Sequence, residues 1–372
     1  MYPIGKPIQE LETPALLLDL DNFQWNINKM FTFAREAGVN VRPHAKTFKT
    51  AAICNQLLEA GAIGLMTQKL TEAEILLHSG VLYGDRNILI SQEIADPHKI
   101  AKLVGLNVAM GEGKVLTSIE NELEAKLLSQ AALKWGVTQH VIIEMTQGRC
   151  GVAPGDPTVA LAKKVVTMKG LTFRGIYGYE GPVDRATALQ RNKLTVDTAN
   201  QIRDVGIEVE IVSAGSTGTY EITGTYPGIT EIEPGSFVFG VSNEGTGYGF
   251  KSINNVYFKP SLSVLTQIIG SNFTDRIITD AGAKVMSQGF DAPRVRVDGD
   301  LIECHEVRLS EEHGTVRFNQ ESEIRPQLSW GQKIEFIPSH CCTCINQHDR
   351  LFVVKDGKLA AVWPITTRGQ YS

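Results

Sequence analysis

The chain has 372 residues, 42% hydrophobic and 21% charged, which is the composition of an ordinary globular protein of about two domains. Its 36 basic and 41 acidic side chains give a formal net charge of −5 without a basic run, so neither nucleic acid nor an anionic membrane surface is expected as a partner. No run of about 18 apolar residues predicts a membrane span, and residues 1–12 lack a secretory signal, so we expect a cytoplasmic protein.

The first predicted elements are a buried strand and an amphipathic helix. Residues 13–20 (TPALLLDL) are almost entirely apolar. Asp21 or Asn22 can cap a helix that runs to about Ala37, and Gly38 is the residue type expected just past a helix end. A short strand at residues 40–43 and a helix at residues 50–60 follow.

Strand-like and helix-like segments then alternate. A further short strand precedes Pro234. The apolar runs that we interpret as strands are 63–67, 87–91, 106–110, 141–145, 171–177 and 209–213. The amphipathic segments between them are 70–78, 97–103, 117–135, 157–168 and 186–205.

About eight strand–helix units with few hairpins predict a parallel sheet closed into a (β/α)8 barrel over residues 20–248. A doubly wound open sheet is the alternative, because a strand count from sequence is loose. No glycine-rich dinucleotide or phosphate-binding fingerprint follows the first strand.

Beyond about Phe250 the pattern changes to short strands separated by turn residues, which predicts a C-terminal antiparallel β domain formed by residues 1–19 and 249–372. Asp356-Gly357 predicts a two-residue hairpin turn between strands at 351–354 and 359–362. The other strands are expected at 261–269, 276–279, 294–297, 315–318 and 332–337.

Polar residues follow several of the predicted barrel strands, at the end where barrel enzymes build their active sites. Lys46 follows the first of these strands and Gln68 the second. Gln147 and Arg149 follow a later strand, and Tyr177 and Tyr179 the next. We therefore expect these side chains to gather on one rim of the barrel.

The loop at residues 213–219 (SAGSTGT) is rich in glycine and small hydroxyl residues, including Ser216 and Thr217. Such loops bring backbone N–H groups and hydroxyls close to a phosphate, although an ordinary turn has the same composition. Gly235 and Ser236, after the next strand, can add phosphate donors, because barrels commonly bind phosphate with the loops after their last two strands.

His340-Cys341-Cys342-Thr343-Cys344 is a possible metal site, because imidazole and thiolate are both zinc ligands. On an extended segment, His340 and Cys342 would lie on one face. Two protein ligands leave positions open, as in a catalytic metal site. The alternative is a run of buried cysteines that serve packing alone.

Five motifs of the chain resemble one family, the D-threonine aldolases and D-serine dehydratases, which use pyridoxal 5′-phosphate (PLP) in an alanine-racemase-like barrel. The resemblance extends from about Thr13 to Gly369. The motifs are Arg42-Pro43-His44-Ala45-Lys46, Gln147 to Val152, Asp280-Ala281-Gly282, Glu312-His313-Gly314 and Pro338-Ser339-His340.

The resemblance implies a role for each matching residue. Lys46 matches the lysine that forms the Schiff base with PLP, and it would be the catalytic residue. His340 and Cys342 match the ligands of a divalent metal, Zn, Mn or Mg. The matching cofactor-binding positions are Gln68, Arg149, Tyr179, Thr217, Gly235 and Ser236.

The chain departs from the family pattern in two places. The metal pair is His-x-Cys, as in the dehydratases, whereas the aldolases have His-x-Asp. Residues 240–244 (GVSNE) lie where the aldolases have acidic residues and a tyrosine, so Tyr248 is a candidate replacement for a phosphate-contacting tyrosine.

The resemblance therefore implies a homodimeric lyase that acts on D-3-hydroxy amino acids. We rank retro-aldol cleavage to glycine and an aldehyde first, and dehydration to a keto acid and ammonia second. An amino-acid racemase and a non-catalytic PLP-binding protein are further alternatives, but a racemase would not use the metal pair.

Overall fold

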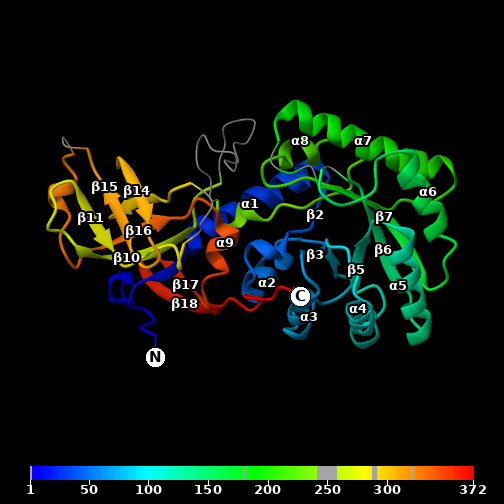
Figure 1. Cartoon of the computed structure of the whole chain (residues 1–372), viewed down its shortest axis with the longest axis horizontal. Helices are drawn as coiled ribbons and strands as arrows, with labels where there is room; N and C mark the ends of the chain where they lie inside the picture. Colours follow the sequence, from blue (N-terminus) through cyan, green and yellow to red (C-terminus); the bar gives the residue numbers. More distant parts are fainter. Residues whose placement is uncertain are drawn as a thin grey trace.

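A computed structural model describes residues 2–146, 148–179, 181, 183–240, 258–286, 291–319 and 322–372. The chain forms a β/α lobe and a β-rich lobe, with α1 (Leu20–Ala37) and α9 (Cys341–Ile345) where the two lobes meet (Figure 1). The predicted domain boundary at residues 248 and 249 lies outside the described residues.

Eight parallel strands form a near-closed barrel, as predicted, in the order β2-β9-β8-β7-β6-β5-β4-β3. Hydrogen bonds from Met66 N to Pro43 O and from Ile63 N to Val41 O link the segments that contain β2 and β3, at the two ends of this order. The strands are β2 (Asn40–Val41), β3 (Gly64–Thr67), β4 (Asn87–Ile90), β5 (Val115–Ile119), β6 (Gln139–Glu144), β7 (Leu171–Gly178), β8 (Ile211–Ala214) and β9 (Glu231–Ile232).

Helices follow the strands and cover the outside of the barrel (Figure 1). The first helix begins two or three residues earlier than predicted, because Asp19, and neither Asp21 nor Asn22, is the N-cap. Asp19 accepts a hydrogen bond from Asn22 N. The remaining barrel helices are α2 (Ala51–Glu59), α3 (Leu70–His78), α4 (Pro97–Met110), α5 (Glu122–Trp135), α6 (Asp156–Val165), α7 (Arg185–Asp204) and α8 (Tyr220–Gly224).

The predicted strand at residues 106–110 is wrong. Those residues are the last turns of α4, whose buried positions include Leu103, Leu106 and Asn107. The strand of this unit is instead β5 (Val115–Ile119), which overlaps the start of the helix that we expected from Thr117 onward. A short apolar run fits the buried stripe of a helix as well as it fits a buried strand, and this ambiguity caused the error.

The C-terminal lobe is a ten-stranded sheet in which β1 (Ala15–Asp19) is central, antiparallel to β10 and parallel to β17. Short β13 and β14 and the helix α9 were not predicted. The strands of this lobe are β10 (Leu262–Gly270), β11 (Arg276–Thr279), β12 (Arg294–Val297), β13 (Asp300–Ile302), β14 (Glu306–Leu309), β15 (Gly314–Arg317), β16 (Lys333–Ile337), β17 (Arg350–Lys355) and β18 (Lys358–Pro364).

The predicted hairpin turn at Asp356-Gly357 is confirmed. Both residues have positive φ, 50° and 69°, which a two-residue turn of this kind requires. The turn joins β17 to β18 in antiparallel pairing.

The end of the chain ties the β lobe to the barrel. Thr367 N donates to Lys49 O, and Thr71 N donates to Ser372 O. Lys49 itself forms a buried ion pair with Glu72, whose Oε2 accepts from Gln68 N at the start of α3. Among the residues that the structure describes, no helix combines the length and apolar character that a membrane span needs.

The Lys49–Glu72 pair predicts a large loss of stability when one partner is removed. Glu72→Ala should lower the free energy of unfolding by about 3–5 kcal/mol, because it leaves the Lys49 ammonium buried without its partner. Urea unfolding measures this change. The matched control is Glu74→Ala on the same helix, which breaks a half-exposed pair with Lys102 and should cost at most about 1 kcal/mol. Equal losses in the two variants would contradict the prediction.

Candidate active site

A cavity of about 230 Å³ opens between the barrel rim and the β lobe. It is lined from both lobes and contains most of the predicted site residues. The lining residues that we predicted are Lys46, Tyr179, Ser216, Thr217, Gly235, Ser236, His340 and Cys342.

Lys46 lies on the 3-10 turn Ala45–Thr47 directly after β2. Its Nζ donates a 3.4 Å hydrogen bond to Gln68 Oε1, and it lies 5.7 Å from the ring centre of Tyr179. Burial lowers the pKa of Lys46 below its ordinary value, and the guanidinium of Arg149 lowers it further. A lowered pKa raises the fraction of neutral amine, which is the nucleophilic form.

The loops after β8 and β9 form a floor of small residues in this cavity. Ser216 and Thr217 are buried, and Thr217 Oγ1 accepts a hydrogen bond from Phe237 N. Gly235 lies so close to the lysine turn that an added Cβ would be 2.4 Å from Thr47 Oγ1. Only glycine therefore allows this loop to approach the turn that carries Lys46.

Gln68 and Arg149 lie beside the cavity and do not line it. Gln68 donates from Nε2 to Ser91 O, which orients its Oε1 toward Lys46. Arg149 lines an adjoining cavity of about 220 Å³ and lies 5.8 Å from the ring of Tyr179. Lys46 and Arg149 therefore both lie near the Tyr179 ring.

The expectation that His340 and Cys342 lie on an extended segment is wrong. His340 has extended backbone angles, but it is the N-cap of α9, and Cys342 lies in the first turn of that helix. The turn nevertheless places both side chains in the lysine cavity, with Cys342 Sγ 3.5 Å from Thr47 Oγ1. A hydrogen bond from Cys341 and the nearby His340 hold the pKa of the Cys342 thiol well below its ordinary value.

Three residues of the cavity were not among the predicted site residues: His44, Thr47 and Glu233. His44 and Thr47 flank Lys46, and Glu233 directly precedes Pro234-Gly235, so their closeness in sequence to predicted residues was the available signal. Cys341 and Cys344 are buried in the core. Gln147, Glu244 and Tyr248 lie outside the described residues.

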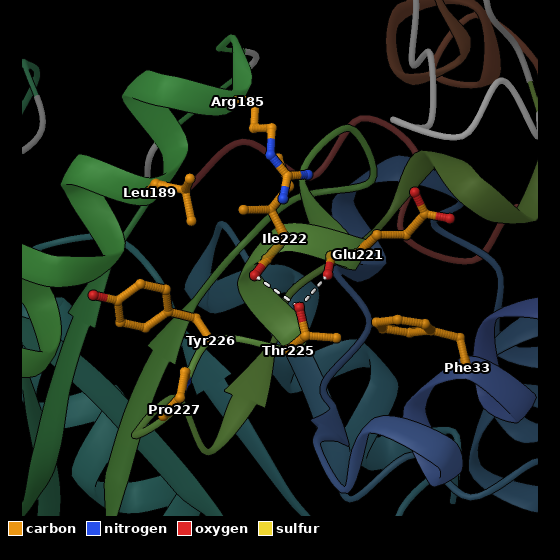
Figure 2. A pocket seen from close by; sticks show the side chains of 8 residues that line it. All are labelled: Phe33, Arg185, Leu189, Glu221, Ile222, Thr225, Tyr226 and Pro227. Carbon is orange, nitrogen blue, oxygen red and sulfur yellow. Dashed lines mark hydrogen bonds between the residues drawn. The ribbon is translucent and has the colours of Figure 1, made fainter.

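A larger cavity of about 550 Å³ lies elsewhere, against α7 and α8. Figure 2 shows its lining, in which Thr225 Oγ1 donates to backbone oxygens of Glu221 and Ile222. It contains none of the predicted site residues, so we place the candidate site at the smaller cavity.

Glu144, at the end of β6, gives the rim a pH-dependent stability. Burial, with the nearby carboxylate of Glu93, raises the pKa of Glu144 from 4.5 to about 8. The folded state therefore binds a proton that the unfolded state has lost, so stability falls as the pH rises between about 4.5 and about 8. In metal-free protein, the free energy of unfolding of Glu144→Gln should rise relative to that of the wild type as the pH increases across this window. The expected gain is of order 3 kcal/mol, measured by urea unfolding. If the free energies of unfolding of the two proteins change in parallel with pH, the prediction is wrong.

Comparisons with known proteins agree with this architecture. Residues 18–243 match the alanine racemase N-terminal domain family, and residues 261–354 match a serine dehydratase domain family. The chain is 31% identical to the D-threonine aldolase of an Arthrobacter species, over 98% of this chain and 95% of that protein. The chain belongs to the D-threonine aldolase and D-serine dehydratase family. The family's members are PLP-dependent lyases, and this chain is one of them.

Two further relatives support the family over the full length. The 3-hydroxy-D-aspartate aldolase of Paracoccus denitrificans is 30% identical over 98% of this chain and 94% of its own length. The crystal structure of the D-threonine aldolase from Filomicrobium marinum superposes with a TM-score of 0.89 at 31% identity, covering 99% of each chain. The two-lobed fold is therefore that of the family.

The residues of the cavity fit PLP, the cofactor that the family implies. The cavity contains one lysine with a lowered pKa, which suits covalent attachment of an aldehyde. The same cavity is lined by the hydroxyl residues Ser216, Thr217 and Ser236 and by Gly235. Small donors of this kind suit a phosphate group.

Proposed function

We propose that the protein cleaves D-3-hydroxy amino acids by a retro-aldol reaction, in the manner of D-threonine aldolase. The observation that carries the proposal is that His340 and Cys342 from the β lobe line the same cavity as Lys46 from the barrel. A metal-binding pair beside a PLP-binding lysine suits substrates that have both an amine and a hydroxyl. The relatives named above as aldolases support the same choice.

Each residue of the site has a proposed part. PLP, when bound, supplies an electron sink for carbanion chemistry. Lys46 binds the cofactor covalently and moves a proton at the substrate, and Gln68 holds the Lys46 Nζ in place. Arg149 and Tyr179 orient the cofactor, while Ser216, Thr217, Gly235 and Ser236 hold its phosphate. His340 and Cys342 would hold a divalent ion, which supplies Lewis acidity toward the substrate hydroxyl.

Dehydration to a keto acid and ammonia is the second candidate. Cys342 favours it, because the dehydratases resemble this chain in having His-x-Cys where aldolases have His-x-Asp. The match of residues 261–354 to a serine dehydratase domain family includes both metal-binding candidates and also supports it. The same resemblance supports a homodimer, which light scattering would test.

Product analysis separates the candidates. With D-threonine, the proposed aldolase releases glycine and acetaldehyde, whereas a dehydratase releases 2-oxobutanoate and ammonia. Turnover should stop with a chelator and return with Mn²⁺ or Zn²⁺, and L-threonine is the control for stereochemistry. Formation of L-allo-threonine, the product of inversion at Cα alone, with neither product set would indicate a racemase and would overturn the proposal.

A further inference from the structure

Acidic side chains from three neighbouring strands converge on the barrel rim beside Arg149. Glu93 lies in the loop after β4, Glu120 directly follows β5, and Glu144 is the last residue of β6. Because β4, β5 and β6 are adjacent parallel strands, their carboxyl ends bring the three side chains to one part of the rim. The carboxylates of Glu93 and Glu120 and the guanidinium of Arg149 therefore all act on Glu144.

Cys150 lies close to two of these carboxylates, those of Glu93 and Glu144. The ligand atoms of Glu93, Glu144 and Cys150 all lie within 4.8 Å of one another. The loop returns tightly onto β6, with Val152 N donating to Glu144 O. Gly151 makes this return possible, since its φ is +102° and an added Cβ would lie 2.8 Å from Glu144 O.

Among the described residues, two oxygens of these carboxylates are buried without a hydrogen-bond partner. Glu144 is only 3% exposed. Within the described ranges, Glu144 Oε2 and Glu93 Oε1 have no hydrogen-bond partner. Glu144 Oε1 lies 3.9 Å from Arg149 Nη2. Buried carboxylate oxygens without partners are costly, and either a proton or a cation between them removes this cost.

We propose that Glu93, Glu144 and Cys150 bind a divalent cation of the Zn²⁺ class, at a second site separate from His340 and Cys342. Two carboxylates with a thiolate favour Zn²⁺ or Co²⁺ over Mg²⁺ or Ca²⁺, which take oxygen ligands. The adjoining cavity of about 220 Å³ is lined by Glu144 and Cys150, so water or a ligand group can complete the coordination.

The backbone around the site is already held in place. Glu124 on α5 accepts hydrogen bonds from Ile94 N, next to Glu93, and from Glu120 N. Glu120 Oε2 in turn accepts from Gly151 N at 2.7 Å, next to Cys150. These bonds connect the loops after β4, β5 and β6, so the three ligands need little rearrangement when the cation binds.

A proton is the competitor for this site. Burial raises the pKa of Glu144 to about 8 and raises the pKa of the Cys150 thiol above its ordinary value. A cation that binds there must displace any proton on the carboxylate and the thiol. Binding should therefore release protons and tighten as the pH rises.

Co²⁺ is the probe that tests the proposal, because a cobalt–thiolate bond gives an intense near-ultraviolet band. The experiment uses the holoenzyme with His340→Ala and Cys342→Ala, because these substitutions remove the other candidate metal site. This variant should bind one Co²⁺ per chain, show the band, and bind about tenfold or more tightly at about pH 8 than at about pH 6. Cys150→Ser should abolish the band, and Glu93→Gln should weaken binding by about tenfold or more. The matched control is Cys304→Ser, a half-buried cysteine in the β lobe.

No cobalt–thiolate band in that background, or a band that survives Cys150→Ser, would overturn the proposal. If the background variant does not fold, Cys150→Ser in the otherwise unchanged chain should lower the Co²⁺ bound per chain by one. An unchanged stoichiometry would overturn it. Because both measurements count metal at Cys150, they stand whether or not the proposed lyase reaction is found.

Discussion

Lys46→Ala should abolish the visible absorption of bound PLP and reduce turnover to background. The amine of Lys46 is the only lysine amine among the described lining residues of the cavity, so no neighbour can replace its covalent bond to the cofactor. Its lowered pKa and its bond to Gln68 prepare this amine for attack. Absorption spectra, with borohydride trapping and peptide mapping, measure where the cofactor is attached.

Lys29→Ala is the matched control for this change. Burial lowers the pKa of Lys29 too, but its ammonium lies 4.6 Å from the Phe258 ring, outside the cavity. This variant should keep both the absorption and the turnover. Trapped cofactor on another lysine of the Lys46→Ala protein would show that the site is assigned to the wrong residue.

His340→Ala and Cys342→Ala should each weaken metal binding at the cavity by at least about 10–100-fold and stop turnover, while the PLP absorption stays. Each change removes a ligand from the β lobe without altering the lysine turn of the barrel. Metal content after dialysis and activity on D-threonine measure the two effects separately.

Cys344→Ala tests whether loss of any nearby cysteine has the same result. Cys344 is on the same short helix, but its Sγ lies 3.7 Å from Val285 O, in the core. It should bind metal normally and lose only stability. If both cavity variants keep metal-dependent turnover, His340 and Cys342 are not the metal ligands.

The barrel was predictable because its signal is local and repeated. Each strand and helix has its own apolar pattern, and glycines such as Gly38 end helices where expected. One error, the strand at residues 106–110, shows the limit of such patterns. With β5 misplaced, Glu120 could not be recognised as a residue of the rim, and the carboxylate cluster beside Arg149 was missed.

The candidate metal-binding pair illustrates a different limit. The spacing of His340 and Cys342 predicted a shared direction, but the assumed extended backbone was wrong because an N-cap and a helical turn also direct such a pair into one cavity. Only packing of α9 against the lysine turn decides which backbone is used. Sequence spacing limits which groups can meet, while the backbone between them depends on distant contacts.

The sequence by itself determined the fold class and the family and indicated the residues of the candidate active site, because motif residues and apolar periodicity are properties of short segments. Only the tertiary structure decided that Lys46 of the barrel shares a cavity with His340 and Cys342 of the β lobe. It alone also brought Glu93, Glu144 and Cys150 within 4.8 Å of one another. Both arrangements join segments far apart in the chain, and their closeness arises from barrel closure and lobe packing, which no local pattern encodes.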